Sequence, residues 1–364
     1  MWTYFSSSFL FSAFGLLLGG VLGWTDGGGI AGALSAMFIV AVLGVLEVSL
    51  SFDNAVVNAT VLQDMDAVWR RRFLTWGMAI AVFGMRIVFP LLIVAVVGEI
   101  TPWSALHLAI SEPQQYADLL TQAHISISAF GGSFLALVGL KHFLNQEKEV
   151  HWIELIERPT AILGRIEAIQ IGVVLAIMYG VSTQLPYDKR MEFLVAGIFG
   201  LLTYIAVDGI GAMLEYANER STTAAMKSGF GAFLYLEVLD ASFSFDGVIG
   251  AFALTTNLWI IAIGLSIGAM FVRSFTIMLV ARGTLAEYRY LEHGAFYAIT
   301  ALGVILYLQS FMHIPEVITG LIGAALIGAA FWSSVAYNRK HAHASGETGG
   351  DADSSPSDAA DHVP

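Results

Sequence analysis

The chain has 364 residues, of which 57% are hydrophobic and only 13% are charged, and its formal net charge is −12. Together with a mean hydropathy of +0.72, this composition excludes a soluble globular protein and indicates a polytopic membrane protein. The chain contains no cysteine, which excludes disulfides and thiolate metal sites, and it lacks the basic, aromatic-rich patches typical of nucleic-acid binding.

Apolar runs long enough to cross about 30 Å of hydrocarbon recur along the chain. We expect an all-α transmembrane domain at residues 1–338 and a disordered acidic cytoplasmic tail at residues 339–364, which are rich in Gly, Ser and Asp. The second and seventh runs are longer than one crossing needs, so each is either tilted or broken. In chain order, about ten runs lie near residues 5–23, 31–60, 73–98, 124–143, 167–184, 192–214, 229–254, 258–281, 294–311 and 316–337.

Positive charge alternates along the connections between these runs. Lys and Arg follow the second, fourth, sixth, eighth and tenth runs, whereas the connections after the third, seventh and ninth carry none. The connection after the fifth run carries only Lys189 and Arg190. The positive-inside rule therefore predicts a multi-pass protein of the cell membrane with both termini in the cytoplasm.

An acidic motif occurs twice inside the apolar runs. Residues 46–53 read LEVSLSFD and residues 239–246 read LDASFSFD, so five of the eight positions are identical. The chemistry is kept, since Glu47 corresponds to Asp240 and the final aspartate is shared. An acid at the centre of a membrane helix costs about 2.5 to 3.5 kcal/mol on insertion scales. Four such acids indicate a function, and we interpret them as a cation site.

The similarity continues into the run that follows each motif. Arg86 follows Gly77 by nine residues, as Arg273 follows Gly264. Corresponding runs lie five apart, an odd number, so the second copy must cross the membrane in the opposite direction. The sequence therefore predicts an inverted repeat of three-helix units, in which transporters bind substrates near the midplane. The expected parts are unit one at about 31–144, linking helices at about 145–227, unit two at about 228–312 and a terminal helix at about 316–337.

The two acids of one motif would not bind a single ion from an unbroken helix. Glu47 and Asp53 would lie about 9 Å apart along the axis and about 120° apart around it. Either a break near Ser51 or a crossing of the two motif helices must therefore bring acids together. Asn54 and Gly247, which directly follow the two aspartates, are weak helix formers and favour a local break.

The candidate ligands are all oxygen atoms. Hard divalent cations prefer such ligands, so Mn²⁺, Ca²⁺ and Mg²⁺ are favoured over Zn²⁺ and Cu⁺, with no ranking among the three. Arg86 and Arg273 are expected to compensate the negative charge of the acids when the ion is absent or when a gate closes. The expected metal ligands are the carboxylates of Glu47, Asp53, Asp240 and Asp246 and the hydroxyls of Ser51 and Ser244.

Further polar residues lie in the same apolar runs. Asp208 and Glu237 are a fifth and a sixth acid, and we favour Asp208 as a metal ligand because its glycine neighbours allow close packing. Asn58 is expected to bond a neighbouring helix. For any single acid, an ion pair or a hydrogen bond that locks two helices is the alternative to an ion site. Close helix approach is expected at Gly320, Gly323 and Gly328.

From Glu47 to Asn54 and from Asp240 to Asp246, the chain resembles the TerC-like integral membrane proteins, which belong to the LysE-type transporter superfamily. The resemblance covers roughly residues 30–312. It implies a cation exporter, with manganese export the best-supported activity of the group and tellurium resistance its historical label. The chain departs from the pattern at Gly247, where the first copy has an asparagine, and in the extra helices between the units. The resemblance also implies an ion site at Glu47, Asp53, Asn54, Asp240 and Asp246.

We therefore expect a secondary transporter, not an enzyme, that exports a divalent cation by alternating access at a midplane carboxylate site. Mn²⁺ is the favoured substrate, and protons carried by the same carboxylates are a candidate coupling ion. The alternative is a metal-binding membrane scaffold of a metal or tellurium resistance system, without transport turnover. A third class is an intramembrane aspartyl protease, whose two buried aspartates share a proton, but the chain lacks a Gly-x-Gly-Asp signature.

Overall fold

A computed structural model describes residues 2–77, 79–144, 150, 152–153, 167–218, 225–252 and 254–347. Every regular element in these ranges is a helix. The N-terminal part contains α1 (Trp2–Gly23), η1 (Trp24–Gly28), α2 (Gly29–Leu50), α3 (Phe52–Asp64), α4 (Ala67–Arg72), η2 (Phe73–Gly77), η3 (Ile80–Val88), α5 (Phe89–Val97), α6 (Pro102–Ser111), α7 (Pro113–Gln122) and α8 (His124–Leu144). The C-terminal part contains α10 (Glu167–Gln184), α11 (Tyr187–Asn218), α12 (Ala225–Phe252), α13 (Leu258–Arg282), α14 (Thr284–Glu287), α15 (Leu291–Gln309) and α16 (Glu316–Glu347).

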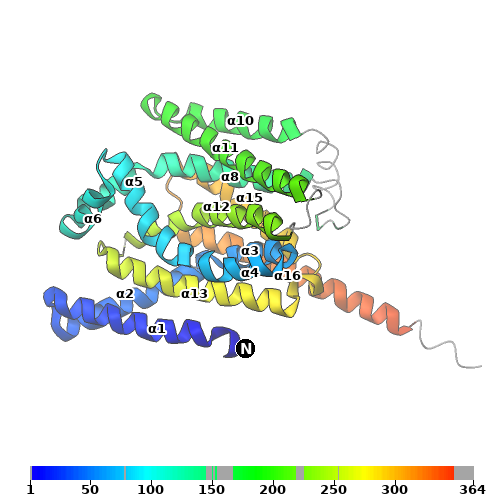
Figure 1. The fold of residues 1–364 in the computed structure, drawn as a ribbon, viewed down its shortest axis with the longest axis horizontal. Coiled ribbons are helices and arrows are strands. Elements are labelled where there is room, and N and C mark those ends of the chain that lie inside the picture. The colour runs from blue at the N-terminus through cyan, green and yellow to red at the C-terminus, as the bar shows by residue number, and fades with distance from the viewer. Residues whose placement is uncertain are drawn as a thin grey trace, which may run out of the picture.

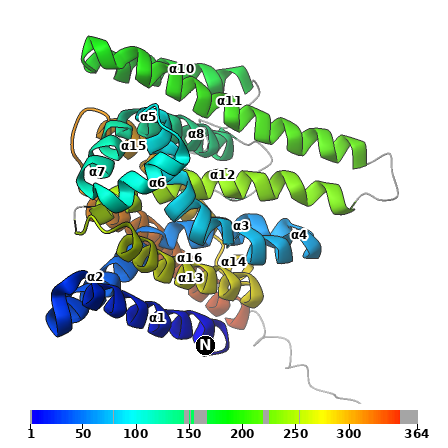
Figure 2. The ribbon, with the colours of Figure 1, turned by 60° about the vertical axis from the view of Figure 1, so that its left-hand side comes forward.

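Seven helical segments in the described ranges are long and apolar enough to cross a membrane, in agreement with the predicted all-α polytopic membrane protein. The first segment contains both α1 and α2, which fold back on one another through a turn at Gly27 (Figure 2). The φ angle of Gly27 is 86°, in the left-handed region that favours glycine. The segments are Trp2–Leu50, Ile80–Val97, His124–Leu144, Tyr187–Ile210, Leu258–Arg282, Leu291–Gln309 and Ile318–Lys340.

The helices form a bundle with roughly parallel axes (Figure 1). α10 and α11 lie at one edge of the bundle, and α1 lies at the opposite edge. Between these edges, α13 packs against α1, α2 and α3, while α8 packs against α11 and α15. α12 contacts α2 and α3 as well as α11 and α13. The two helices that carry the acidic motif therefore meet in the interior of the bundle.

Small residues let α13 approach α2 closely at the first motif. A Cβ atom added to Gly264 would lie 2.6 Å from the Cβ of Leu43, and one added to Gly268 would lie 2.4 Å from the Cβ of Glu47. Any larger residue would push the helices apart, because small residues at a membrane helix interface allow the backbones to approach. These glycines thus place the side chain of Glu47 in the protein interior.

Large apolar side chains cover the outside of the bundle. Phe38 on α2, Phe199 on α11 and Trp332 on α16 are exposed. Such an apolar exterior fits a protein surrounded by lipid, since lipid tails are as apolar as these side chains.

Two details differ from the sequence-based expectation. The third apolar run is built from η2, η3 and α5, and its first two elements are π-helical, a form that is often found at functional sites. The last helix, α16, continues to Glu347, beyond residue 338, where we expected the transmembrane domain to end. The remainder of the predicted tail, residues 348–364, and residues 154–166 of the linking region lie outside the described residues.

Candidate functional site

The first motif copy is broken in the middle. α2 ends at Leu50 and α3 begins at Phe52, because Ser51 has φ −105° and ψ 17° and lies outside the helical region. The second copy lies in α12, which is continuous from Ala225 to Phe252. The sequence allowed two arrangements, a break in a motif helix and a crossing of the two motif helices. The break is found in the first copy only, and the crossing brings the two copies into contact.

Glu47 is neutralised inside the protein. Only 1% of Glu47 is exposed, and its carboxylate forms an ion pair with Arg86 on η3. The hydroxyl of Ser51 donates a hydrogen bond to the same carboxylate oxygen over 3.1 Å. Arg86 also donates to the carbonyl oxygen of Ala81. Arg86, one of the two expected charge-compensating residues, thus pairs with the first acid of the motif.

Asp240 has a different environment, although it occupies the corresponding position in α12. It is buried and accepts hydrogen bonds from the amide groups of Asn54 and Asn58, the latter over 3.3 Å. Among the described residues, no Lys or Arg forms an ion pair with Asp240. The amide oxygens of Asn54 and Asn58 are buried without a hydrogen-bond partner in the described part of the chain. Asp240 is therefore held by neutral groups that have spare oxygen atoms.

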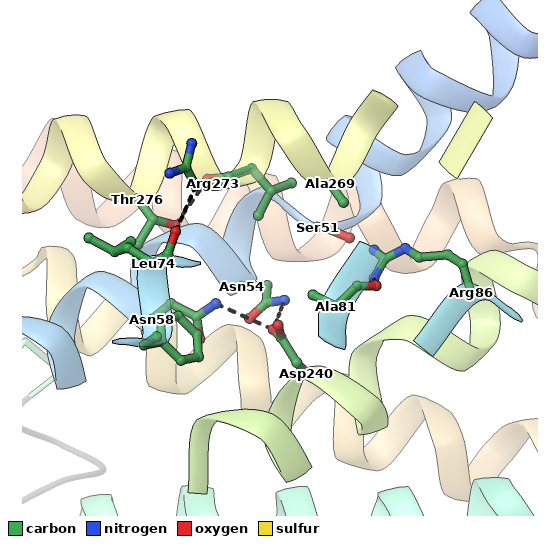
Figure 3. Close-up of a pocket in the computed structure, with 12 residues that line it drawn as sticks. Ser51, Asn54, Asn58, Leu74, Ala81, Arg86, Asp240, Ala269, Arg273 and Thr276 are labelled. Atoms are coloured by element: carbon green, nitrogen blue, oxygen red, sulfur yellow. Dashed lines mark hydrogen bonds between the residues drawn. The ribbon is translucent and has the colours of Figure 1, made fainter. Parts of the chain in front are cut away.

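A small cavity of about 20 Å³ opens beside Asp240. Figure 3 shows Arg86 and Arg273 approaching this cavity from different helices, with Asp240 and Asn54 between them. Its volume exceeds the roughly 10–15 Å³ that a water molecule needs. We call it the asparagine cavity, and its polar lining consists of Ser51, Asn54, Asn58, Arg86, Asp240, Arg273 and Thr276.

A second cavity of about 20 Å³ lies beside Asp53. Asp53 is buried, and one of its oxygens accepts a hydrogen bond of 2.9 Å from the backbone N–H of Asn54. Helix α16 closes this side, since a Cβ atom on Gly323 would lie 2.9 Å from the Oδ2 of Asp53. The hydroxyl of Thr319, also on α16, is buried without a partner in the described part of the chain. We call this the threonine cavity, and it is lined by Glu47, Ser51, Asp53, Gly247 and Thr319 together with apolar residues.

Ser51 lines both cavities. The break in the first motif helix therefore lies between two small polar spaces, where we expected the two motif copies to form one midplane site. Within the residues whose side chains are described, which exclude Asp246, no three His, Asp or Glu side chains gather closely enough to hold a metal ion. An ion in either space would need amide, hydroxyl or backbone oxygens in addition to the carboxylates.

Where the two motif copies cross, they contact each other through equivalent positions. The first acid of copy one, Glu47, lies against Gly247, where an added Cβ would be 2.9 Å from its Oε2. The first acid of copy two, Asp240, lies against Asn54, which is the residue that corresponds to Gly247. Each first acid thus contacts the residue that follows the second acid of the other copy.

The counter-charges do not follow the same symmetry. Arg86 pairs with Glu47, whereas the corresponding Arg273 donates its Nε–H to the carbonyl oxygen of Leu74 over 3.0 Å. Arg273 lines the asparagine cavity but has no ion pair with Asp240 in the described part of the chain. The two halves therefore differ in charge balance although their sequences correspond.

One expected ligand, Ser244, lies outside these cavities. Ser244 is buried and its hydroxyl has no hydrogen-bond partner among the described residues, and it lines neither the asparagine nor the threonine cavity. The backbone of Asp246 belongs to α12, but its side chain lies outside the described residues.

Asp208 does not join the other acids. Its carboxylate forms an ion pair with Lys141, with Nζ–O distances of 2.6 and 2.8 Å, and 47% of its side chain is exposed. The neighbouring Gly209 packs against nothing within 4 Å. Gly209, one of the glycine neighbours on which we based the choice of Asp208, therefore makes no close helix contact at this point of α11.

Glu237, the acid to which we preferred Asp208, lies against η2 in the interior of the protein. It is buried, and neither carboxylate oxygen has a hydrogen-bond partner in the described part of the chain. It packs against Gly77, where an added Cβ would lie 2.7 Å from its Oε1. Its spacing of three residues from Asp240 puts both on one face of α12, a signal that was present in the sequence. Thr319, by contrast, lies outside the duplicated motif and had no such signal.

The chain was also compared with known proteins. The model of one family, described as a protein of unknown function (DUF475), matches residues 52–341. The match includes Asp53, Asn54 and Asp240 and begins just after Glu47 and Ser51. No curated protein and no solved structure matched the chain. Because the matched range covers well over half of its length, the chain belongs to the DUF475 family.

Proposed function

We propose that this protein is a membrane transporter that exports a divalent metal cation, with Mn²⁺ as the favoured substrate. The observation that carries the proposal is the environment of Asp240. This buried carboxylate faces a small cavity and two asparagines. Arg86 and Arg273 line the same cavity, but no described Lys or Arg forms a direct ion pair with Asp240. An acid at the centre of a membrane helix costs about 2.5 to 3.5 kcal/mol, so an acid kept there without a direct ion pair favours a site that binds a cation.

The chemistry of the asparagine cavity suits a hard cation. Carboxylate, amide and hydroxyl oxygens are the ligands that Mg²⁺, Ca²⁺ and Mn²⁺ accept. Asn54 and Asn58 donate their N–H groups to Asp240, and rotation of each amide would turn its oxygen toward an ion. Waters complete the coordination shell of such cations in many sites, which fits the small number of side-chain ligands.

The break at Ser51 supports a path from one cavity to the other. Irregular backbone inside a membrane is tolerated where it lines a cavity or is covered by protein, and broken helices form the binding sites of many transporters. Because Ser51 lines both cavities, an ion that leaves Asp240 would meet the oxygens of Asp53 and Thr319 next. We propose that alternating access exposes these two stations to opposite sides of the membrane.

An inverted repeat is part of this proposal. It is supported by the reciprocal contacts of Glu47 with Gly247 and of Asp240 with Asn54, because a pseudo-two-fold axis exchanges such pairs. Arg86 pairs with an acid of the motif, whereas Arg273 bonds a backbone carbonyl. This difference fits a transporter that has adopted one of its two alternating states. The opposite state would pair Arg273 with Asp240 and release Arg86 from Glu47.

We further propose ten crossings and cytoplasmic termini. An even number of crossings puts both termini on one side of the membrane. The ten proposed crossings are α1, α2 with α3, η3 with α5, α8, α10, α11, α12, α13, α15 and α16. The basic helix α4, the C-terminal end of α13 and the N-terminus lie toward the same end of the bundle (Figure 1). The positive-inside rule assigns that end to the cytoplasm.

The direction of transport and the coupling ion rest on the resemblance to the TerC-like proteins, which implies export of manganese. Protons are the coupling ion we propose, because a carboxylate that releases a divalent cation in a membrane takes up protons in its place.

Flux measurements on the purified protein in liposomes test the proposal. We expect Mn²⁺ to move across vesicles that contain the protein and to quench a trapped indicator dye. Asp240→Asn should lower the initial rate at least tenfold, since even groups that only support a metal ligand are worth about 10–100-fold in affinity. Asp208→Asn is the matched control, because it removes the same charge from an exposed ion pair, and its rate should stay within about twofold of wild type.

Two results would contradict transport. Equal losses in Asp240→Asn and Asp208→Asn would show that Asp240 has no special role. Saturable Mn²⁺ binding that depends on Asp240, without any flux, would favour the metal-binding scaffold.

A further inference from the structure

A large hollow lies at the end of α13, away from the two polar cavities. Its volume is about 490 Å³, and α3, α13, α15 and α16 surround it. Most of its lining is apolar, including Val56, Leu279 and Ile327. Phe331 on α16 packs against Tyr288 with tilted rings whose centroids lie 4.6 Å apart. We call it the α16 groove. Nothing in the proposed path of the cation uses it.

The α16 groove continues toward the break in the first motif helix. A second apolar hollow of about 430 Å³ lies between α2 and α16, and it shares Phe52 and Ala324 with the α16 groove. The lining of this second hollow is mainly leucine, valine and alanine. The two hollows share part of their lining and follow α16 from Gly320 to Phe331, which is about 16 Å of helix. An apolar depression of this kind suits a flexible hydrocarbon chain.

The outer rim of the groove carries one charge of each sign. Arg282 is the last residue of α13, and Glu287 is the last residue of α14. Gly283 separates these helices with a φ of 62°, and this left-handed turn brings both charged residues to the same rim. Arg282 and Glu287 are exposed, and within the described residues neither forms an ion pair.

The depth of the rim matches that of lipid headgroups. α13 has 25 residues, and an apolar helix of about 20 residues spans the hydrocarbon core. A charged residue at its last position therefore lies at the membrane surface, where basic pockets between helices bind lipid headgroups.

We infer that the α16 groove binds a phospholipid whose headgroup carries both a phosphate and a primary ammonium group. The guanidinium of Arg282 suits the phosphate, because arginine binds phosphate oxygens through paired hydrogen bonds. The carboxylate of Glu287 suits the ammonium group, which has three N–H donors; a quaternary ammonium has none. An acyl chain fills the apolar depression, and each buried CH₂ contributes about 0.8 kcal/mol.

Lipid retention in a mild detergent tests this inference without any transport assay. The full-length protein is reconstituted into nanodiscs of equal parts phosphatidylethanolamine and phosphatidylcholine, extracted, and weighed by native mass spectrometry. We expect the wild type to retain phosphatidylethanolamine in at least threefold excess over phosphatidylcholine, which corresponds to about 0.65 kcal/mol.

Gly328→Leu is designed to fill the groove. Gly328 lines the groove, and an added Cβ meets nothing within 4 Å, so the larger side chain projects into the hollow without a clash. Gly180→Leu is the matched control, because Gly180 on α10 also has open space around it and lies outside the groove. We expect Gly328→Leu to lose the retained lipid and Gly180→Leu to keep it, with both variants melting within a few degrees of wild type.

Variants at the rim separate the two headgroup contacts. Glu287→Gln should keep the bound lipid but lose the preference for phosphatidylethanolamine, whereas Arg282→Gln should lower the total amount that is retained. Equal retention by Gly328→Leu and Gly180→Leu would overturn the groove as the binding site. Equal retention of the two lipids by the wild type would overturn the assigned headgroup. Loss of Mn²⁺ flux plays no part in either outcome, so this inference and the proposed function fail separately.

Discussion

The two copies of the acidic motif have nearly the same sequence but different surroundings. In the first copy the helix breaks at Ser51, and Glu47 is paired with Arg86. In the second copy the helix is continuous, and Asp240 is held by the amides of Asn54 and Asn58. A motif thus defines the available chemistry, while the neighbouring helices decide which acid pairs with an arginine and which is held by amide groups.

The largest expected difference between the copies is at the arginines. Arg86→Met should lower the free energy of unfolding by about 3 to 5 kcal/mol, because it leaves Glu47 as a buried charge without a partner. Arg273→Met should lower it by about 1 kcal/mol, since the arginine loses only a hydrogen bond to a backbone carbonyl. Unfolding titrations in detergent measure both values.

A second variant checks the reason for this difference. Adding Glu47→Leu to Arg86→Met removes the unpaired acid, so the double variant should be more stable than Arg86→Met alone. If the two arginine variants lose equal stability, the asymmetry between the copies has no energetic meaning.

An intermediate loss of stability is expected from substitutions at Asn54 and Gly247, the residues that contact Asp240 and Glu47 from the other motif copy. Asn54→Ala removes a hydrogen bond to the buried carboxylate of Asp240 and should cost about 1 to 3 kcal/mol. Gly247→Ala adds a methyl group 2.9 Å from a carboxylate oxygen of Glu47, which must shift slightly at a cost of about 1 kcal/mol. The same unfolding titrations compare them, and a larger loss for Gly247→Ala would show that Glu47 is held more rigidly than Asp240.

The smallest difference is expected at the serines. Ser51→Ala removes the hydrogen bond to Glu47 and should cost about 1 kcal/mol. Ser244→Ala should be neutral or slightly stabilising, because the hydroxyl of Ser244 is buried without a partner among the described residues. Thermal melting of the two variants beside wild type measures this difference, and a clear loss for Ser244→Ala would reveal a contact that the second copy makes in another state.

Part of the site could be predicted from the sequence. Weak helix formers at the motif made a local break one of two arrangements that the sequence allowed, and the spacing of Glu47 and Asp53 showed that one straight helix could not bring them together. The different surroundings of Asp208 and Glu237 could not be predicted, for a physical reason. Close packing at a glycine needs another helix at that point: a Cβ added to Gly209, beside Asp208, would meet nothing within 4 Å, whereas Gly77 of η2 packs against Glu237.

The sequence alone was enough to assign the class of the protein and to identify the acids that need an explanation in lipid. These properties follow from the transfer free energies of individual side chains, which hold in any fold. Only the tertiary structure decided that Arg86 pairs with Glu47, that Asp240 faces two asparagines and that α16 closes the space beside Asp53. Those contacts depend on how helices far apart in the chain cross, and such crossings are set by the packing of the whole bundle.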